Sequence, residues 1–421
     1  DERQRRRGCH VDIPWKTFRR AARTSKFAQV FRRERVFKAP RRVVPPRRCS
    51  PPFCAFECAT PTASAEDDVA KAFIASDAEL SFLTENRPAP RSCPAGIIHP
   101  IFIGIPSSEI VGCVPRKRFG FRGGVRKHGA GDYDFGPGAE AEYKRGYRDA
   151  YFGLTRKKAG WDCMRHYEIA AAGALPYFED DPADAPALTL AHWPKKLLSE
   201  LRSWPGVHGE NRTVDASRLD AGGRYAAAAA GLLRYVRARL TTAALAAYVL
   251  ETLGKSAAKN VVVLSADPTP DYLRETVVHG FRKRLGERAV DFVKPPHLYE
   301  PAAGSHEAPF DVDERSTLYG HGFTYAYRLA DDPRVDRSDI EGKLRRRFFD
   351  VVVYASVHRG LPFLDAVLEH YRADEIAFVD GEDEHGWSNF SAALPAVGTY
   401  FMRELPDGCP PVVEGGVEVP R

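Results

Sequence analysis

The residues best placed to do chemistry lie in the stretch KKAGWDCMRHYE, residues 157–168. Lys157 and Lys158 precede an expected helix, and Arg165 and Glu168 lie three residues apart on one face of it. Free N–H groups and the helix dipole favour phosphate at a helix N-terminus, and the two lysines before it would suit a diphosphate. A glutamate can accept hydrogen bonds from ribose hydroxyls. The pattern therefore indicates a nucleotide site, and its alternative is a surface helix with a local Arg–Glu pair behind a basic loop.

A second set of polar residues follows two apolar strands in the second half of the chain. His358 follows VVVYAS, and Asp380 follows IAFV. Ligands of open α/β sheets bind at the carboxyl ends of strands, and the imidazole pKa lies near neutrality. His358 or Asp380 is therefore a candidate general base for a hydroxyl group. The alternative is a hydrogen-bonded loop histidine without a chemical role.

The first set needs strands and a helix to hold it in place. We expect strands in residues 97–106, 151–155 and 174–178, and a helix in residues 163–172. Asp162 would cap the N-terminus of this helix, and Gly173 would end it in the left-handed conformation. Three residues of the helix would face the core, namely Met164, Tyr167 and Ala171. Arg165 and Glu168 would then lie outside the core.

The rest of the chain alternates helices with strands. Further helices are expected at 194–204, 223–239 and 242–253. Residues 259–294 show a buried strand, a polar turn, an amphipathic helix and a second strand, which is a βαβ unit. Two more strands, FDVVVYASVH and DEIAFVDGEDE, flank the helix LPFLDAVLEHY. Near-continuous Val, Ile and Phe predict a parallel sheet with both faces covered, so the fold class is α/β with two Rossmann-like lobes.

Composition and pattern divide the 421-residue chain into four parts. These are a disordered arm at 1–65, an α/β domain at 86–254, a Rossmann-like domain at 258–405 and a tail at 406–421. The arm explains the net charge of +6, because its first 50 residues hold 17 Arg or Lys against 4 Asp or Glu. We expect the arm to make weak contact with anionic surfaces through residues 1–48, and no specific nucleic acid partner.

No run of 18 uncharged apolar residues occurs, so we expect a soluble protein that is cytoplasmic or associated with endomembranes. Four of the eight cysteines lie in the arm, and the other four are scattered singly. This distribution predicts reduced thiols and no disulfide framework.

The segments GWDCMRHYEIAAAGALPYFEDD and HWPKKLL resemble the nucleotide-binding half of exostosin-type, two-Rossmann-domain (GT-B) glycosyltransferases. The family pattern is an Arg and then a Glu in a helix, followed by Gly, a hydrophobic residue, Pro and a strand. Arg165, Glu168, Gly173 and Pro176 occupy it here. The resemblance implies that Arg165 meets the donor phosphates and Glu168 the donor ribose. The wider chain is similar to uncharacterised glycosyltransferase-like proteins with KKAGWDCxRHYE and FVDGEDE segments.

The resemblance implies transfer of a sugar from a nucleotide-sugar donor to the hydroxyl of a carbohydrate or glycan acceptor. The donor is a substrate, so no cofactor and no metal are expected. In the family the acceptor half precedes the nucleotide half, whereas here the nucleotide-like half comes first. We therefore expect a permuted order, or a chain cut from a longer tandem.

Two alternatives remain open at this point. The turn DGEDEH offers Asp380, Glu382, Asp383 and Glu384, which are enough carboxylates for a divalent cation. A carboxylate pair after an apolar strand is similar to the DxD site of single-domain, metal-dependent glycosyltransferases, although a solvated acidic turn would look the same. The other alternative is a non-catalytic module that binds a carbohydrate or another partner and keeps the fold.

Overall fold

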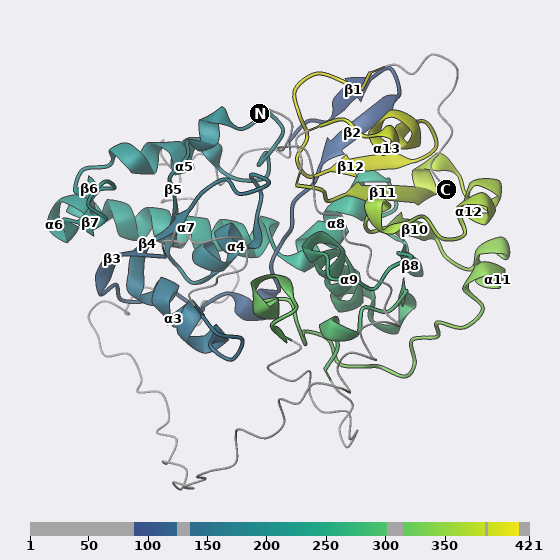
Figure 1. Cartoon of the computed structure of the whole chain (residues 1–421), viewed down its shortest axis with the longest axis horizontal. Helices are drawn as coiled ribbons and strands as arrows, with labels where there is room; N and C mark the ends of the chain where they lie inside the picture. The colour runs from purple at the N-terminus through teal and green to yellow at the C-terminus, as the bar shows by residue number, and fades with distance from the viewer. Residues whose placement is uncertain (1–87, 124–134, 301–314, 384–385, 412–421) are drawn as a thin grey trace, which may run out of the picture. The chain divides into compact units, whose positions relative to one another are not determined.

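The computed structural model describes residues 88–123, 135–300, 315–383 and 386–411, which belong to one compact unit of the chain (Figure 1). The arm expected at 1–65 lies outside the described residues. Within them, strands form a seven-stranded sheet, a three-stranded sheet and a two-stranded ribbon. We call the first two the large sheet and the small sheet. The prediction of an α/β fold with a mostly parallel sheet is confirmed.

The large sheet has the strand order β1-β2-β12-β11-β10-β8-β9. Its strands are β1 (Arg91–Cys93), β2 (Gly96–Pro100), β8 (Val261–Leu264), β9 (Ala289–Phe292), β10 (Val351–Tyr354), β11 (Ile376–Asp380) and β12 (Thr399–Met402). All neighbours pair in parallel except β1 and β2. The five strands from β8 to β12 follow the 2-1-3-4-5 order of doubly wound folds, which bind ligands at their carboxyl edge.

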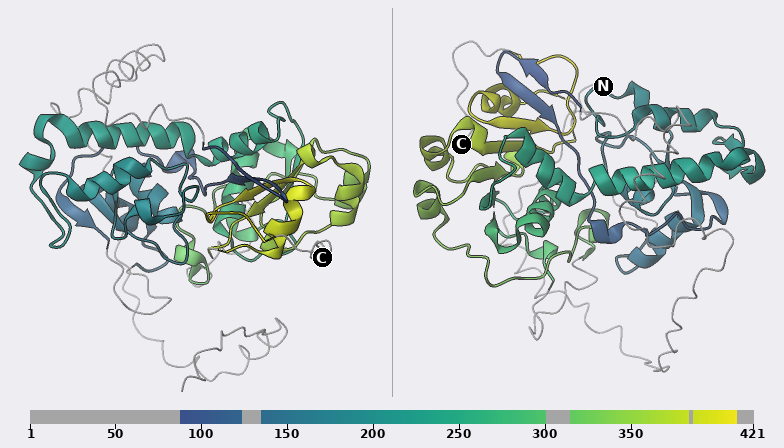
Figure 2. Two further views of the ribbon diagram at one scale, coloured as in Figure 1. Left: turned by 90° about the horizontal axis from the view of Figure 1, so that it is seen from above. Right: turned by 180° about the vertical axis from the view of Figure 1, so that it is seen from behind.

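Continuous runs of apolar residues explain why the large sheet is buried on both faces. Val261 and Val263 pack in the core that includes residues of α8 (Thr242–Thr252) and α9 (Tyr272–Leu285). Val262 and Leu264 pack in a second core with residues of α11 (Ile340–Arg345) and α12 (Leu364–His370). Figure 2 shows these helices on either side of the strands. A strand buried on both faces needs apolar residues at every position, as VVVL and VVVY have.

The small sheet has the order β3-β4-β5 and is parallel throughout. Its strands are β3 (Phe119–Arg122), β4 (Ala150–Thr155) and β5 (Leu175–Phe178). The helices of this region are α3 (Glu140–Asp149), α4 (Met164–Ala171), α5 (Lys195–Glu200), α6 (Ala216–Leu219) and α7 (Arg224–Arg239), and β6 (Val207–His208) pairs with β7 (Thr213–Val214).

In the described part of the chain, no helix has the length and apolar character needed to cross a membrane.

In the sequence, the strands of the small sheet lie between β2 and β8, which both belong to the large sheet. Strands β1 and β2 fall within the domain expected at 86–254, yet they join the large sheet, so the sheets do not follow a boundary near residue 255. The chain leaves the large sheet after β2 and returns before α8. The two crossings pair with each other, because the Ile105 N–H donates to the Leu240 carbonyl and the Thr242 N–H to the Ile105 carbonyl, each at 2.9 Å. Nothing local in GIIHP specifies which sheet it joins.

The ends of α4 were predicted with mixed success. Gly173 is left-handed at φ 71°, as expected of a residue that ends a helix. Asp162 does not cap the helix, because Cys163 is the N-cap residue and makes no side-chain capping bond. The Asp162 Oδ2 atom instead accepts hydrogen bonds from the Ile103 N–H at 3.2 Å and the Tyr167 hydroxyl at 3.0 Å. The contact with Ile103, which is distant in the sequence, has therefore replaced the predicted contact of Asp162 with the N-terminus of the helix.

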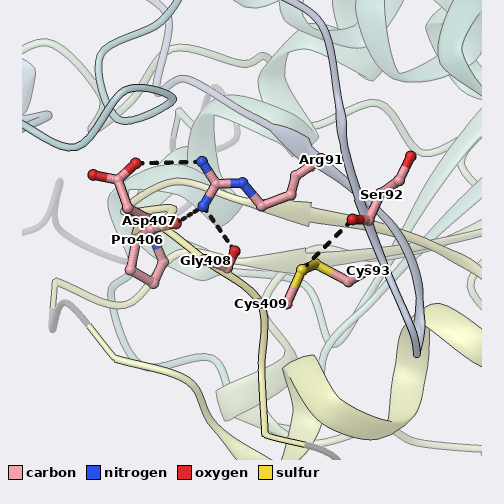
Figure 3. The surroundings of a disulfide bond; sticks show 7 residues. All are labelled: Arg91, Ser92, Cys93, Pro406, Asp407, Gly408 and Cys409. Atoms are coloured by element: carbon pink, nitrogen blue, oxygen red, sulfur yellow. Dashed lines mark hydrogen bonds and ion pairs between the residues drawn. A yellow bond between two sulfur atoms is a disulfide. The ribbon is translucent and has the colours of Figure 1, made fainter.

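A disulfide links Cys93 in β1 to Cys409 after β12, which corrects the expectation of reduced thiols (Figure 3). The two residues are 316 positions apart, with Cα atoms 5.5 Å from each other. Arg91 supports the same junction, since its guanidinium donates to the Gly408 carbonyl at 2.9 Å and to Asp407 at 3.3 Å. Spacing could not reveal the pair, because its proximity depends on the β1–β2–β12 order. Disulfides of this kind persist in oxidising compartments.

Breaking this disulfide should destabilise the protein measurably. The bond closes a very long loop in the unfolded chain, and loss of a disulfide typically costs about 2–4 kcal/mol. A Cys93→Ser/Cys409→Ser variant should therefore unfold at lower urea than the wild type, whereas Cys113→Ser, outside the disulfide, should change stability less. Peptide mapping without reductant should recover the linked Cys93 and Cys409 peptides. Alkylation of both thiols in the untreated native protein would show that the bond does not form.

Candidate functional site

The two candidate bases predicted from the sequence lie next to each other at the carboxyl edge of the large sheet. Asp380 is the last residue of β11, and His358 lies in the short turn Val357–Arg359 that follows β10. These strands are parallel neighbours, so their ends meet at one edge. The Nε2 atom of His358 lies 3.1 Å from the Oδ1 atom of Asp380.

Asp380 is held in place by three donors. Its Oδ2 atom accepts a hydrogen bond from the Tyr400 hydroxyl at 2.7 Å, and Oδ1 also accepts one from the Glu382 N–H at 3.2 Å. The Asp380 side chain is 2% exposed, whereas that of His358 is 24% exposed. The pair therefore has a fixed, buried carboxylate and an imidazole that solvent and ligands can reach. Tyr400 was not predicted, because it lies 20 residues from Asp380 in an ordinary apolar strand.

Electrostatics favour the charged form of this pair. Burial alone would lower the pKa of His358, but the hydrogen bond to Asp380 and the charges of Asp380, Glu382 and Asp271 raise it above 6.5. Burial would likewise raise the pKa of Asp380, but His358 and the Tyr400 hydroxyl lower it below 3.8. The imidazole can act as a base only once it has lost its proton, which requires a pH above this raised pKa.

The loop after β8 packs against the turn that carries His358. The Ala266 N–H donates to the Arg359 carbonyl at 3.0 Å, and a Cβ on Gly360 would lie 2.7 Å from the Ala266 Cβ. The Arg359 guanidinium lies 3.6 Å from Asp271, which caps the N-terminus of α9. Strands β8 and β10 are the point where the sheet order reverses, the usual ligand position in such folds.

A buried Arg–Glu pair follows β12 on the same edge. The Arg403 guanidinium donates to the Gly381 carbonyl at 2.9 and 3.1 Å, to Asp383, and to the Asp162 carbonyl. It also contacts the Glu404 carboxylate at 3.0 Å. Asp383 of the acidic turn is therefore already neutralised by a protein cation. No set of three metal-ligating side chains gathers within the described residues, and Glu384 and His385 lie outside them.

Glu404 reaches into the loop that precedes α4. Its carboxylate accepts hydrogen bonds from the N–H groups of Trp161 at 3.0 Å and Asp162 at 2.8 Å. A Cβ on Gly160 would lie 2.6 Å from the Glu404 Oε1 atom, so a larger residue would force this carboxylate to shift. The sequence suggested that the N-terminus of this helix and the two lysines before it receive a diphosphate. The Trp161 and Asp162 N–H groups instead donate to the Glu404 carboxylate of the protein itself.

The predicted donor-binding cations have different surroundings. The Lys157 N–H donates to Asp180 at 3.0 Å, and its ammonium lies 5.6 Å from the centre of the Trp161 ring. The pKa of Lys158 is lowered by partial burial and then by the positive charge of Arg165. The Arg165 side chain is half-buried and forms no ion pair with the described residues, although the charge of Glu168 acts on it. Lys158 and Arg165 therefore form a cationic pair whose charge Glu168 balances in part.

Glu168 does not lie outside the core as expected. It is 8% exposed, and its two oxygens accept hydrogen bonds from the Tyr143 hydroxyl at 2.5 Å and the Thr324 hydroxyl at 2.6 Å. Burial raises its pKa, although both hydroxyls and nearby cations oppose the shift. Glu168 is buried because α3 and the segment around Thr324 cover this face of α4, which the sequence of the helix alone cannot show.

Cys163 and His166 form a second pair that the sequence analysis missed. The Cys163 sulfur lies 3.5 Å from the His166 Nε2 atom. The same nitrogen is 2.7 Å from the Trp161 carbonyl, so it carries the proton and donates it there, while Nδ1 faces the Thr155 hydroxyl at 2.9 Å. Burial lowers the pKa of His166 to about 4 and raises that of the Cys163 thiol. This imidazole therefore cannot activate the thiol as a nucleophile.

Comparison with known proteins does not assign the chain to a family. No protein-family model, no curated protein and no solved structure matches it. The geometry at the carboxyl edges of the two sheets is therefore the basis for any functional conclusion.

The charge coupling between His358 and Asp380 can be measured by following the imidazole resonances of His358 with pH. The wild-type pKa should lie above 6.5, and Asp380→Asn should lower it because a negative charge and a charged acceptor are lost. Other histidines should titrate as in the wild type, which controls for unfolding. The stabilisation from His358 is complete below pH 6.5 and is lost as pH rises through the raised pKa. An unchanged His358 titration in the variant would rule out the coupling.

Removing Glu404 should destabilise the fold strongly. Glu404→Ala would leave the buried Arg403 guanidinium and the Trp161 and Asp162 amides without this carboxylate. Breaking a buried pair in this way costs about 3–5 kcal/mol. The matched control is Glu341→Ala, which removes an exposed ion pair with Arg345 and should cost under about 1 kcal/mol. Urea unfolding that gives equal midpoints for the two variants would contradict the role assigned to Glu404.

Proposed function

We propose that the protein is a metal-independent glycosyltransferase that moves a sugar from a nucleotide-sugar donor to an acceptor hydroxyl. The observation that carries the proposal is the contact between the carboxyl edges of the two sheets. Glu404, after β12, holds the amides of Trp161 and Asp162, between β4 and α4. Segments that follow strands of both sheets thus meet around one buried ion pair. Ligands of α/β sheets bind at such edges.

The base in this reaction would be His358. Its Nε2 atom faces Asp380, which leaves Nδ1 as the nitrogen that can accept a proton. The acceptor oxygen forms a bond to the anomeric carbon of the sugar as the bond from that carbon to the diphosphate oxygen breaks. The hydroxyl proton passes to Nδ1, and Asp380 stabilises the imidazolium that results.

The departing diphosphate gains negative charge, which Lys158 and Arg165 can stabilise through charge-assisted hydrogen bonds. A half-buried guanidinium that forms no ion pair with the described residues is suited to an external anion. Lys157 is less suited, because its ammonium lies over the Trp161 ring. Glu168 is 8% exposed and both of its oxygens already accept hydrogen bonds from the Tyr143 and Thr324 hydroxyls, so we assign it a positioning role.

A second candidate is a metal-dependent transferase that uses the acidic turn. The observation in its favour is that burial and the charges of Asp271 and Asp380 raise the pKa of Glu382. A cation would relieve this repulsion. Sugar transfer that is lost in excess chelator and recovers with Mn²⁺ or Mg²⁺ would favour this candidate. A protein that binds the donor but neither transfers nor hydrolyses it would instead be a non-catalytic module.

The donor site can be tested by titrating UDP, GDP and their sugar conjugates into the wild type and an Arg165→Ala variant. Loss of a charge-assisted phosphate contact costs about 1.5–3 kcal/mol, so affinity should fall about ten- to a hundredfold. Arg345→Ala removes the same charge from an exposed ion pair on α11 and should bind like the wild type. If the wild type binds none of these ligands, or Arg165→Ala binds them equally well, the donor-site assignment is wrong.

A further inference from the structure

The segment 318–327 has an unusual backbone, and we call it the left-handed segment. Five of its residues have positive φ, namely Gly320 (56°), His321 (55°), Gly322 (69°), Thr324 (74°) and Tyr327 (56°). A non-glycine residue in such a conformation costs about 1–3 kcal/mol and persists only where the surroundings enforce it. Such residues gather at ligand sites more often than elsewhere, so the surroundings of this segment need an explanation.

Contacts with helices beside the small sheet and with the chain that follows β9 of the large sheet hold this backbone in place. The Thr324 N–H donates to Glu140 at 2.9 Å, and its hydroxyl to Glu168 at 2.6 Å, which ties the segment to α3 and α4. On the other side, the Tyr327 N–H donates to the His297 carbonyl at 3.0 Å. Figure 1 shows this stretch, in green, between α3 and α9.

The left-handed segment presents an exposed aromatic ring beside α9. Tyr319 is 56% exposed, although large aromatic side chains are usually buried. Its ring centre lies 6.0 Å from that of Tyr272, the first residue of α9, which in turn lies 4.9 Å from the ring of the buried Tyr325. The Tyr325 hydroxyl donates to the Tyr319 carbonyl at 3.1 Å. A Cβ on Gly320 would lie 2.9 Å from the Tyr272 hydroxyl, so a larger residue would press on this ring.

This aromatic pair adjoins the candidate catalytic edge. Tyr272 directly follows Asp271, whose carboxylate lies 3.6 Å from the Arg359 guanidinium. Arg359 is the residue after His358, and the charge of Asp271 also contributes to the raised pKa of His358. The exposed ring of Tyr319 is thus linked through Tyr272 and Asp271 to the turn that carries His358, while Thr324 of the same segment contacts Glu168 on α4.

We infer that Tyr319 and Tyr272 form a stacking surface for a pyranose ring of the acceptor carbohydrate. The apolar C–H face of a sugar ring packs well on an aromatic face, and binding sites combine such aromatic surfaces with a few fixed polar groups. Tyr272 begins α9 directly after Asp271, which lies at the carboxyl edge of the large sheet beside Arg359, so the rings adjoin the edge that carries the proposed base, and this favours the acceptor sugar as the ligand. The inference rests on the proposed transferase function, because that function supplies a sugar acceptor. The left-handed backbone has the role of fixing the two rings against the site.

The test is a calorimetric titration of cellohexaose, mannohexaose, chitohexaose and a heparosan oligosaccharide, with UDP as a separate ligand. The wild type should bind at least one of the oligosaccharides. Tyr319→Ala should weaken that binding about tenfold, which corresponds to loss of one aromatic stacking contact. Tyr319→Phe keeps the ring and should bind like the wild type. Phe348→Ala is the matched control, because it removes another aromatic side chain that is 51% exposed.

The outcomes separate this inference from the proposed function. Oligosaccharide binding that survives Tyr319→Ala, or that is lost in Tyr319→Phe, overturns the stacking surface. So does a wild type that binds none of the four oligosaccharides. UDP binding that is weakened by Tyr319→Ala would assign the surface to a nucleobase and also overturn it. UDP binding that depends on Arg165 would still support the donor site in each of these cases.

Discussion

The buried pair of Arg403 and Glu404 determines how the candidate site is put together. Ionised groups lose several kcal/mol when they leave water, and a buried pair persists only if the remaining donors and acceptors find partners. Arg403 meets this condition through Gly381 and Asp383 on the large sheet and the Asp162 carbonyl in the loop before α4. Glu404 meets it through two amides of that same loop. One ion pair thus connects the acidic turn with the start of α4.

Carboxylates of similar chemistry have different roles here because their surroundings differ. Asp380 is buried but accepts a hydrogen bond from an imidazole that is itself accessible, so its charge acts on a group that can meet a ligand. Glu168 is buried, and its two oxygens accept hydrogen bonds from protein hydroxyls, so its carboxylate holds α3 and the segment around Thr324 against α4. Glu404 compensates a buried cation. Residue type alone would have given all three the same candidate status.

The parts of the fold that local pattern determines were predictable. Strands such as VVVL and VVVY need only be apolar throughout, and Gly173 needs only a helix before it. The sequence placed His358 and Asp380 after two apolar strands, but their contact depends on β10 and β11 being parallel neighbours, which the structure shows. The Cys93–Cys409 disulfide was not predictable, since it depends on strand order across 316 residues.

The same limit explains the errors within the site. Asp162 has the right residue type and position for a helix cap, but Ile103 and Tyr167 compete for its carboxylate and win. Ile103 becomes a neighbour only through tertiary packing, whereas Tyr167 lies on the helix that follows Asp162. A glycine before a helix fits a phosphate loop and fits close approach of a side chain equally well. Gly160 serves the second purpose, and only the position of Glu404 distinguishes the two.

The occupied amides also restrict how a donor could bind. In a phosphate loop, backbone N–H groups supply much of the stabilisation, with helix dipole and side chains in support. Here the Trp161 and Asp162 N–H groups already bind Glu404, and a diphosphate at that place would have to displace a carboxylate and leave Arg403 without its partner. In the proposed donor site, phosphate recognition would therefore come from side chains, and Lys158 and Arg165 are the cations on which that proposal depends.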